Sequence, residues 1–234
     1  YNFKCWAPSS RELDITDENR MSKFYFDNRK RLQKMHAIVH CAAFTDVHGS
    51  EKDKPKAIEV NINGTRNVVR GLCWPLGIPI VYISTDYVYE GRFGGYKETD
   101  KVSPVNFYAQ TKYLGEAYTE EKDLIIRTSF KPNEPWPYPK AFDDLYTSSD
   151  YVDIIVPKIL DLICNGESGV YNIGTERKTI YDLARRRKTK VKPMSKNDIK
   201  DVYLPSDISM NLDKYNTYYD EQYGCDAPDC CPEQ

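Results

Sequence analysis

The chain has 234 residues, of which 40% are apolar, and its 33 basic and 35 acidic residues give a formal charge of −2. This length suits one domain, or one domain with a small additional lobe. The balanced charge argues against a general nucleic-acid-binding protein, and no apolar run of about 18 residues is present to span a membrane. The sequence therefore indicates a soluble globular protein without a secretory signal.

Apolar runs of strand length alternate with longer segments of helical period. The predicted strands cover residues 3–7, 37–43, 79–84, 124–128 and 170–173. Several are almost continuously apolar, which is typical of parallel strands covered on both faces. The predicted helices run from Asp53 to Leu72, over 107–121, over 150–164, and from Thr179, where Asp182 completes a capping box. This order predicts an α/β fold with a doubly wound parallel sheet.

Two parts of the chain depart from this pattern. Residues 131–146 are rich in proline and predict an irregular loop, and the sequence beyond about residue 189 is polar and turn-rich. We therefore expect a doubly wound domain over 1–130, a less regular lobe over 131–216 and an acidic, cysteine-containing tail over 217–234. A basic run at 185–192 follows a predicted helix and indicates an exposed helix end rather than a nucleic-acid contact.

The seven cysteines fall into two groups. Four lie singly in apolar segments: Cys5, Cys41, Cys73 and Cys164. We expect these to be buried, reduced thiols, which favours a cytoplasmic location. The other three crowd into the tail: Cys225, Cys230 and Cys231. Their spacing fits no zinc pattern, so a solvated tail is favoured over a metal site.

Tyr108 and Lys112 form a Tyr-x-x-x-Lys pair on one face of a predicted helix. A tyrosine hydroxyl can pass a proton to a carbonyl oxygen when a neighbouring ammonium favours its phenolate form. The spacing alone is a weak signal, because Tyr118 and Lys122 repeat it. For that second pair, an ordinary exposed helix face is the better interpretation.

Context favours the first pair, because the preceding apolar strand ends in Ser84, Thr85 and Asp86. Ligands of doubly wound sheets bind at the carboxyl ends of the strands. We expect these side chains to face a ligand crevice to which the next helix returns Tyr108. The alternative is that Ser84 and Thr85 merely cap a turn.

Six segments across residues 37–130 resemble an extended short-chain dehydrogenase/reductase, most closely of the dTDP-4-dehydrorhamnose reductase type. They read HCAAFTD at 40–46, VNINGTRN at 60–67, ISTDYVYEG at 83–91, YKETD at 96–100, YAQTK followed by LGE at 108–116, and IRTSF at 126–130. The segment 204–215 is similar to that family's closing segment. The resemblance implies a Rossmann-like NAD(P)-binding domain over 1–130 and a substrate-binding lobe with late Rossmann elements over 131–216.

The resemblance also implies catalytic roles for three residues. Tyr108 would protonate the 4-keto oxygen of a nucleotide-linked 4-keto-6-deoxy sugar while a nicotinamide delivers hydride. Lys112 would bind the nicotinamide ribose and lower the pKa of the tyrosine, and Thr85 would hydrogen-bond the reacting oxygen. Further substrate contacts are implied for four residues: Asp86, Thr45, Tyr87 and Phe130. The sugar is weakly defined, because Phe130 stands where the family usually has tryptophan.

Further residues are implied to bind the cofactor. Asp14 and Ile15 resemble the pair that borders the adenine. The other cofactor positions are Cys41, Ala42, Ala43, Ser84, Tyr108 and Lys112. Arg11 could meet a 2′-phosphate, which favours NADPH over NADH. Asn61 could serve near the active site or tie a helix to a strand, and both readings stay open.

The Rossmann pattern also requires a first strand and a glycine-rich turn, where backbone amides bind the pyrophosphate. The first glycine of this chain is Gly49, and residues 1–17 resemble the family's second strand and the segment after it. We therefore expect roughly 25–30 residues of a βαβ unit to precede Tyr1. The chain as printed is expected to be inactive on its own.

The resulting prediction is an NAD(P)H-dependent reductase of dTDP-rhamnose biosynthesis that takes a nucleotide-sugar substrate. The pattern allows a homodimer and predicts no metal, membrane or nucleic-acid partner. One alternative is an epimerase or dehydratase that retains NAD. Another is a non-catalytic dinucleotide-binding subunit, as in the methionine adenosyltransferase regulatory protein that resembles this family.

Overall fold

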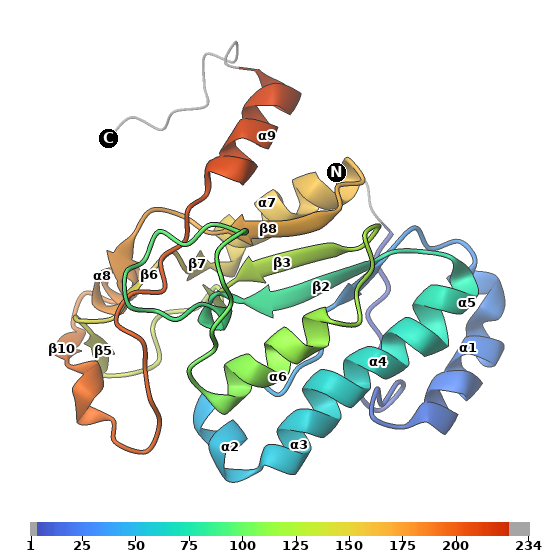
Figure 1. Cartoon of the computed structure of the whole chain (residues 1–234), viewed down its shortest axis with the longest axis horizontal. Coiled ribbons are helices and arrows are strands. Elements are labelled where there is room, and N and C mark those ends of the chain that lie inside the picture. Colours follow the sequence, from blue (N-terminus) through green and yellow to red (C-terminus); the bar gives the residue numbers. More distant parts are fainter. Residues whose placement is uncertain (1–3, 225–234) are drawn as a thin grey trace.

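A four-stranded parallel sheet forms the centre of the protein, seen in a computed structural model that describes residues 4–224. Its strands are β1 (Ile38–His40), β2 (Ile80–Thr85), β3 (Leu124–Thr128) and β8 (Gly169–Ile173), in the spatial order β1-β2-β3-β8 (Figure 1). The register pairs Thr85 with Thr128, and Thr128 with Ile173. Helices cover both faces, which confirms the predicted α/β fold.

One face of the sheet is covered by a long helical run and by α6 (Phe107–Glu116). The run begins at the predicted cap Asp53, whose side chain accepts a hydrogen bond from the backbone N–H of Lys56 at 3.1 Å. It consists of α3 (Lys54–Ile58), a π-helical turn (Glu59–Asn63), α4 (Gly64–Val68), a second π-helical turn (Val69–Cys73) and α5 (Trp74–Leu76). The helix predicted from Asp53 is thus confirmed.

Helix α1 (Glu18–Leu32) lies outside this run and is absent from the predicted elements. Asp17 caps it by accepting hydrogen bonds from two backbone N–H groups of the first turn. Its buried residues Met21, Phe24 and Leu32 pack against the second π-helical turn. Charged residues dominate the rest of the helix, so its apolar stripe is too narrow to stand out in the sequence.

The opposite face is covered by α7 (Val152–Cys164), and α9 (Asp213–Tyr223) packs beside β8. Ile155, Ile159 and Leu162 of α7 pack on Leu124 and Ile126 of β3. The side chains at the alternate strand positions point the other way, because Tyr82 and Ser84 of β2 reach α6. The sheet is therefore buried on both sides, as its almost continuous apolar runs predict.

The predicted strand at 3–7 is wrong for its described part, because residues 4–7 have no regular secondary structure. The predicted strand at 37–43 shortens to Ile38–His40. Among the described residues, β1 pairs only with β2 and so forms one edge of the sheet. A β-strand forms its backbone hydrogen bonds with a neighbouring strand. None of the described strands pairs with residues 4–7, so these residues do not form one.

The other edge of the sheet, at β8, is occupied by side chains. Glu98 accepts a hydrogen bond from the backbone N–H of Asn172 at 2.9 Å. Lys214 of α9 donates to the carbonyl oxygen of Val170 at 2.7 Å. These contacts satisfy backbone groups that an edge strand would otherwise leave exposed.

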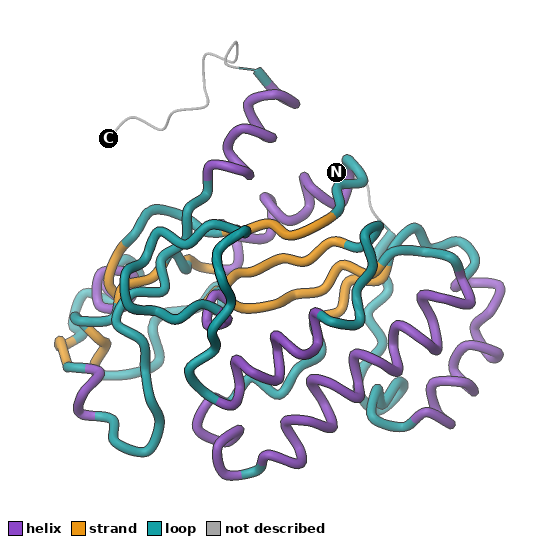
Figure 2. Tube along the Cα trace, in the orientation of Figure 1, coloured by secondary structure: helices purple, strands orange, loops and turns teal. Residues whose placement is uncertain are grey.

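The lobe at the carboxyl end of the sheet is built from short strand pairs (Figure 2). These are β4 (Phe130–Lys131) with β7 (Asp150–Tyr151), β5 (Lys140–Phe142) with β10 (Lys192–Met194), and β6 (Tyr146–Thr147) with β9 (Lys178–Thr179). The lobe also holds the short helices α8 (Ile180–Arg185) and η4 (Lys196–Asp198), whereas α2 (Val47–Lys52) packs on α3 and α6, and η3 (Asp86–Val88) directly follows β2. The proline-rich segment is therefore only partly irregular, since β5 runs through it.

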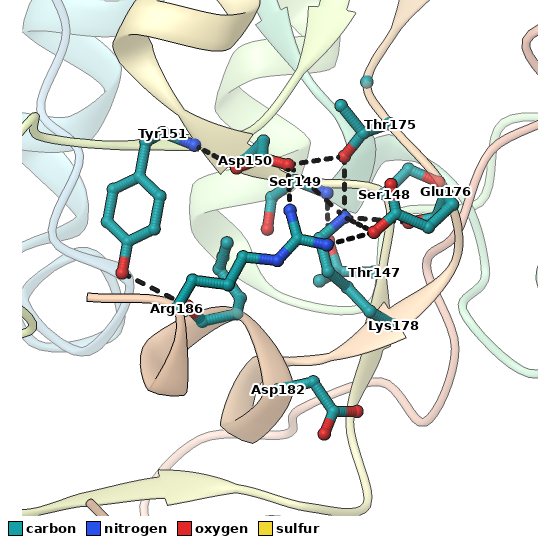
Figure 3. A network of polar contacts seen from close by, with 12 residues as sticks. Thr147, Ser148, Ser149, Asp150, Tyr151, Thr175, Glu176, Lys178, Asp182 and Arg186 are labelled. Carbon is teal, nitrogen blue, oxygen red and sulfur yellow. Dashed lines mark hydrogen bonds and ion pairs between the residues drawn. The ribbon is translucent and has the colours of Figure 1, made fainter. Parts of the chain in front are cut away.

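A polar network fastens this lobe to the start of α7 (Figure 3). The buried carboxylate of Asp150 accepts hydrogen bonds from Thr175 at 2.8 Å and from Arg186 at 2.6 Å. Arg186 also contacts Glu176, and Lys178 donates to the carbonyl oxygen of Glu176 at 2.8 Å. The basic run is thus more than an exposed helix end, because Arg186 forms part of this network.

The predicted capping box of α8 is confirmed, with Thr179 and Asp182 bonding each other's backbone N–H groups. Helix α6 ends at Glu116 rather than at residue 121, so the second Tyr-x-x-x-Lys pair does not lie on it. Helix α9 crosses the predicted tail boundary at residue 217, which corrects that boundary.

None of the helices in the described chain combines the length and apolarity needed for a membrane crossing.

The cysteine prediction is largely wrong for the four single residues. Only Cys73 is buried, whereas Cys5, Cys41 and Cys164 are exposed free thiols. The predicted strand that holds Cys41 ends at His40, so this thiol lies past the covered part of the sheet. The tail cysteines at 225, 230 and 231 lie outside the described residues.

Candidate active site

Helix α6 carries Tyr108 and Lys112 to the carboxyl end of β2. Asn106 caps this helix by accepting a hydrogen bond from the backbone N–H of Ala109 at 2.9 Å. The Tyr82 hydroxyl donates to the carbonyl oxygen of Lys112 at 3.0 Å. A Cβ atom at Gly115 would lie 2.2 Å from that hydroxyl, so glycine permits the close approach of helix and strand. This packing fixes where the helix presents Tyr108 and Lys112.

Thr85 and Tyr108 meet at this point. Thr85 is the last residue of β2, and its hydroxyl accepts a hydrogen bond from the backbone N–H of Tyr87 at 3.2 Å. The pKa of Tyr108 is raised to about 12, first by burial and then by the neighbouring Asp86 carboxylate, while a hydrogen bond with Thr85 opposes the shift. Tyr108 is therefore a neutral phenol near neutral pH, which is the form that can donate a proton.

Lys112 lies one helical turn further along the same face. Its side chain is buried, and its ammonium lies 4.3 Å from the centre of the Tyr82 ring. Burial lowers the pKa of Lys112 to about 8, while Glu116 and Cys41 oppose the shift. The influence of Cys41 places this ammonium near the end of β1. Thr85 and Tyr108 thus lie within hydrogen-bond reach of each other, and Lys112 follows one helical turn along the same face of α6.

The burial of Lys112 predicts a specific dependence of stability on pH. The pKa of this lysine falls from 10.5 to about 8 on folding, so the unfolded chain binds more protons between these values. Relative to Lys112→Met, the wild-type free energy of unfolding should rise by on the order of 3 kcal/mol from pH 8 to pH 10.5. Urea unfolding of both proteins over this range tests the slope, and parallel pH profiles would contradict it.

Two predicted substrate residues, Asp86 and Tyr87, adjoin Thr85 and Tyr108. Asp86 is fully buried, and burial raises its pKa to about 6, with Lys131 opposing the shift. Burial also raises the pKa of Tyr87, and Asp86 and Tyr108 raise it further. Asp86, Tyr87 and Tyr108 therefore lie close enough to influence one another. Lys131 joins this cluster from β4 and had no signal in the sequence.

Ser84 does not face the predicted crevice. Its hydroxyl donates to Glu116 at 2.5 Å, inside a buried network in which Arg127 forms an ion pair with Glu116 at 2.8 Å. The alternation of side chains along a strand sends Ser84 to the α6 side and Thr85 to the other. The cofactor role of Ser84 stays a prediction, and in this structure its hydroxyl is bonded to Glu116.

Asn61 ties a helix to the end of a strand, which is the second of the two readings left open by the sequence. Its amide oxygen accepts from the backbone N–H of Phe44 at 2.7 Å, and its amide nitrogen donates to the Phe44 carbonyl at 3.2 Å and to Thr111 at 2.9 Å. These bonds occupy both amide hydrogens, so Asn61 has no donor left for a cofactor. The bonds support the helix-to-strand tie, and the cofactor contact of Asn61 stays a prediction.

The other predicted cofactor residues lie along the β1 end of the sheet. Cys41 and Ala42 are exposed, and Ala43 is partly exposed. Asp14 accepts hydrogen bonds from the backbone N–H and hydroxyl of Thr16, at 3.0 and 2.7 Å, which lower its pKa. Ile15 packs against Gly64, the first residue of α4. A Cβ atom at Gly64 would lie 2.6 Å from the Ile15 side chain, so only glycine allows this approach.

Three predicted residues are not brought into the cluster by any contact. Arg11 and Thr45 are exposed, and Phe130 on β4 is 40% exposed. Two surface hollows, of about 430 and 350 Å³, are lined by other parts of the chain. Within residues 4–224, no group of three or more His, Cys, Asp or Glu side chains could hold a metal ion.

A parallel sheet with a threonine, a tyrosine and a lysine at its carboxyl end defines a Rossmann-like nucleotide-binding protein of the short-chain dehydrogenase/reductase class. Residues 1–134 match the model of the RmlD substrate binding domain. The chain belongs to this family, as its sequence motifs predict.

Curated relatives include two bacterial reductases. The dTDP-4-dehydrorhamnose reductase of Mycobacterium tuberculosis is 34% identical over 134 residues, covering 53% of this chain and 41% of that protein. The dTDP-4-keto-6-deoxy-D-glucose reductase of Streptomyces niveus is 30% identical over 206 residues, covering 76% of this chain and 67% of that protein. The chain therefore spans about two fifths of the length of the first relative and two thirds of the second.

A solved structure and a mammalian relative complete the comparison. The dTDP-4-dehydrorhamnose reductase of Bacillus anthracis, solved in complex with NADP, is 26% identical with a TM-score of 0.80, covering 91% of this chain and 83% of that one. Methionine adenosyltransferase 2 subunit beta of Bos taurus is 30% identical over 122 residues, covering 52% of this chain and 35% of that protein.

Proposed function

We propose that the protein is an NADPH-dependent reductase of a nucleotide-linked 4-keto-6-deoxy sugar in dTDP-rhamnose biosynthesis. The observation that carries this proposal is the position of Tyr108 beside Thr85 at the carboxyl end of the sheet, with Lys112 one turn further along α6. The names of the two bacterial reductases support this substrate class, and the NADP complex of the Bacillus anthracis protein supports the cofactor. A cytoplasmic location and a homodimer stay predictions.

The residues of the chain fit a dinucleotide. The buried Lys112 ammonium has no hydrogen-bond or ion-pair partner among the described residues, so it can bind a ribose hydroxyl. Cys41, Ala42 and Ala43 present small side chains at the end of β1, where a flat ligand can approach the backbone. Asp14 and Ile15 would border the adenine, and the exposed Arg11 could reach a 2′-phosphate. The bound cofactor would supply the hydride.

The proton comes from Tyr108. Its hydroxyl gives a proton to the carbonyl oxygen as hydride reaches the carbonyl carbon, so the ketone becomes an alcohol and the phenol becomes a phenolate. The Lys112 ammonium stabilises this phenolate, and solvent returns the proton afterwards. Thr85 hydrogen-bonds the same carbonyl oxygen and fixes its direction.

Cofactor stoichiometry tests the proposal against the NAD-retaining alternative. We expect the full-length protein to oxidise one NADPH for each molecule of dTDP-linked 4-keto-6-deoxy sugar reduced, followed by the loss of nicotinamide absorbance. An epimerase or dehydratase would convert the sugar without net NADPH consumption. That outcome would reject the reductase while keeping the nucleotide-sugar site.

A non-catalytic binding subunit is the second candidate, and the mammalian relative is the observation that favours it. In that case the protein would bind dinucleotide, reduce no keto sugar and associate tightly with an enzyme partner. Turnover assays combined with co-purification distinguish the two functions.

A further inference from the structure

Thr111 of α6 carries a buried hydroxyl that has no part in the chemistry described above. Its side chain is 1% exposed, so the hydroxyl can bond only to the groups packed around it. It donates to the backbone carbonyl oxygen of Tyr108 at 2.8 Å and accepts a hydrogen bond from the amide nitrogen of Asn61 at 2.9 Å. Asn61 belongs to the first π-helical turn of the long helical run. Thr111 therefore joins that run to the backbone of the proposed general acid.

The chemistry of the groups fixes the direction of each bond. The amide oxygen of Asn61 accepts from the backbone N–H of Phe44 at 2.7 Å, so its amide nitrogen is the donor to Thr111. A hydroxyl has one proton to donate, and Thr111 gives it to the Tyr108 carbonyl. The chain of bonds thus ends on the backbone of Tyr108 and not on its phenol. It can hold the tyrosine in place, but it cannot pass a proton to the ring.

The other end of the chain lies at the proposed cofactor site. The amide nitrogen of Asn61 also donates to the carbonyl oxygen of Phe44 at 3.2 Å, so one side chain holds both backbone groups of this residue. Phe44 directly follows Ala43, the last of the small residues after β1 that are proposed to lie against the cofactor. Asn61 and Thr111 therefore tie the backbone of Tyr108 to the end of the cofactor-binding segment.

The neighbouring backbone groups of α6 have other partners. Glu51 accepts a hydrogen bond from the N–H of Phe107 at 2.8 Å, and Asn106 caps the helix. Among the described side chains, Thr111 is the one that bonds the backbone of Tyr108 itself.

We propose that Thr111 is a positioning residue for the reduction: together with Asn61 it fixes the first turn of α6 against the end of β1, and so fixes the Tyr108 hydroxyl against the bound cofactor. The assignment rests on the proposed function, in which Tyr108 is the general acid. Proton and hydride must reach the same carbonyl group, so the distance between acid and cofactor matters. A displacement of about 1 Å can cost on the order of 100-fold in rate.

A double-mutant cycle tests this role in the full-length protein. Thr111→Val removes the hydroxyl with little change in volume. We expect kcat for the 4-keto sugar to fall roughly 10- to 100-fold, with KM within about threefold, because the acid is misplaced while the substrate contacts remain. Thr111→Ser keeps the hydroxyl and should recover most of the loss. In a Tyr108→Phe background, Thr111→Val should cause no further loss, because the group that it positions is gone.

Thr119→Val is the matched control. The Thr119 hydroxyl also donates to the carbonyl oxygen three residues earlier, that of Glu116, at 2.8 Å, but it lies beyond the end of α6. Its removal should leave kcat within about twofold of the wild type. If Thr111→Val does not fold, Thr111→Cys gives the same comparison with a weaker donor.

A measurement without substrate separates this role from the proposed function. The ¹⁹F resonance of Tyr108 in fluorotyrosine-labelled protein is identified by its loss in Tyr108→Phe. Thr111→Val should shift it and Thr119→Val should not. A shift in a protein that does not reduce the sugar would reject the reductase and keep the positioning role. Additive losses in the cycle, or an unshifted resonance in an active enzyme, would reject the positioning role alone. An unshifted resonance without turnover would reject both.

Discussion

Tyr108→Phe should lower kcat for reduction of the 4-keto sugar by about 10²- to 10⁴-fold, the range for loss of a positioned general acid. The substitution removes one hydroxyl from a partly exposed ring, so the fold and the Michaelis constant should change little. The measurement is steady-state NADPH oxidation by the full-length protein, with cofactor affinity determined separately. The loss follows from the position of Tyr108 beside Thr85, where it is the acid that the trio provides.

Tyr118→Phe is the matched control. Tyr118 and Lys122 have the same sequence spacing, but they lie beyond the end of α6. Turnover should therefore stay within about twofold of the wild type, because the change removes one hydroxyl from a partly buried ring away from the site. Equal losses in the two variants would show that tyrosine removal acts through stability. Full activity of Tyr108→Phe would remove this residue from the chemistry.

Arg127→Met should destabilise the protein by about 3–5 kcal/mol, because it leaves the buried Glu116 carboxylate without its cation. The two side chains are each 6% exposed and are joined by bonds of 3.1 and 2.8 Å. Arg127 also donates to the hydroxyl of Tyr89 at 3.1 Å. Urea unfolding measures the free-energy loss. Adding Glu116→Leu should recover much of it, since removing both charges avoids the unpaired carboxylate.

Lys122→Met breaks an ion pair of a different kind. Lys122 and Glu120 are 3.3 Å apart, and their side chains are about half exposed. This substitution should cost less than about 1 kcal/mol. Similar losses of unfolding free energy for Arg127→Met and Lys122→Met would show that burial does not increase the contribution of the Arg127–Glu116 ion pair to stability.

The sequence predicts the central architecture well because parallel strands buried on both faces leave continuous apolar runs. The strands that reach Ser84 and Thr128, the helix capped by Asp53 and the capping box at Thr179 all follow from local patterns. Helix α1 escapes prediction because its buried stripe is narrow and its surface is highly charged. The strand at 3–7 fails because a strand depends on a neighbour, which no local pattern encodes.

The sequence predicts that a helix and a strand end meet at Tyr108 and Thr85, and the structure places these two residues together. The direction of a single side chain is harder to predict from the sequence. Ser84 adjoins Thr85 but points to the opposite face of the sheet, and the amide of Asn61 is used up by Phe44 and Thr111. Lys131 carries no sequence signal, because only the packing of the lobe brings it near Asp86.

The two edges of the sheet have different consequences for assembly. At β8, the side chains of Glu98 and Lys214 hydrogen-bond the backbone groups that an added strand would need. Another strand therefore cannot easily pair with this edge of the sheet. No described strand pairs with the far side of β1, which leaves this as the edge where the sheet can be extended. The exposed residues Cys41 and Ala42 directly follow β1, so a strand added beside β1 would lie next to the proposed cofactor site. Strand addition and ligand binding are thereby linked at one edge.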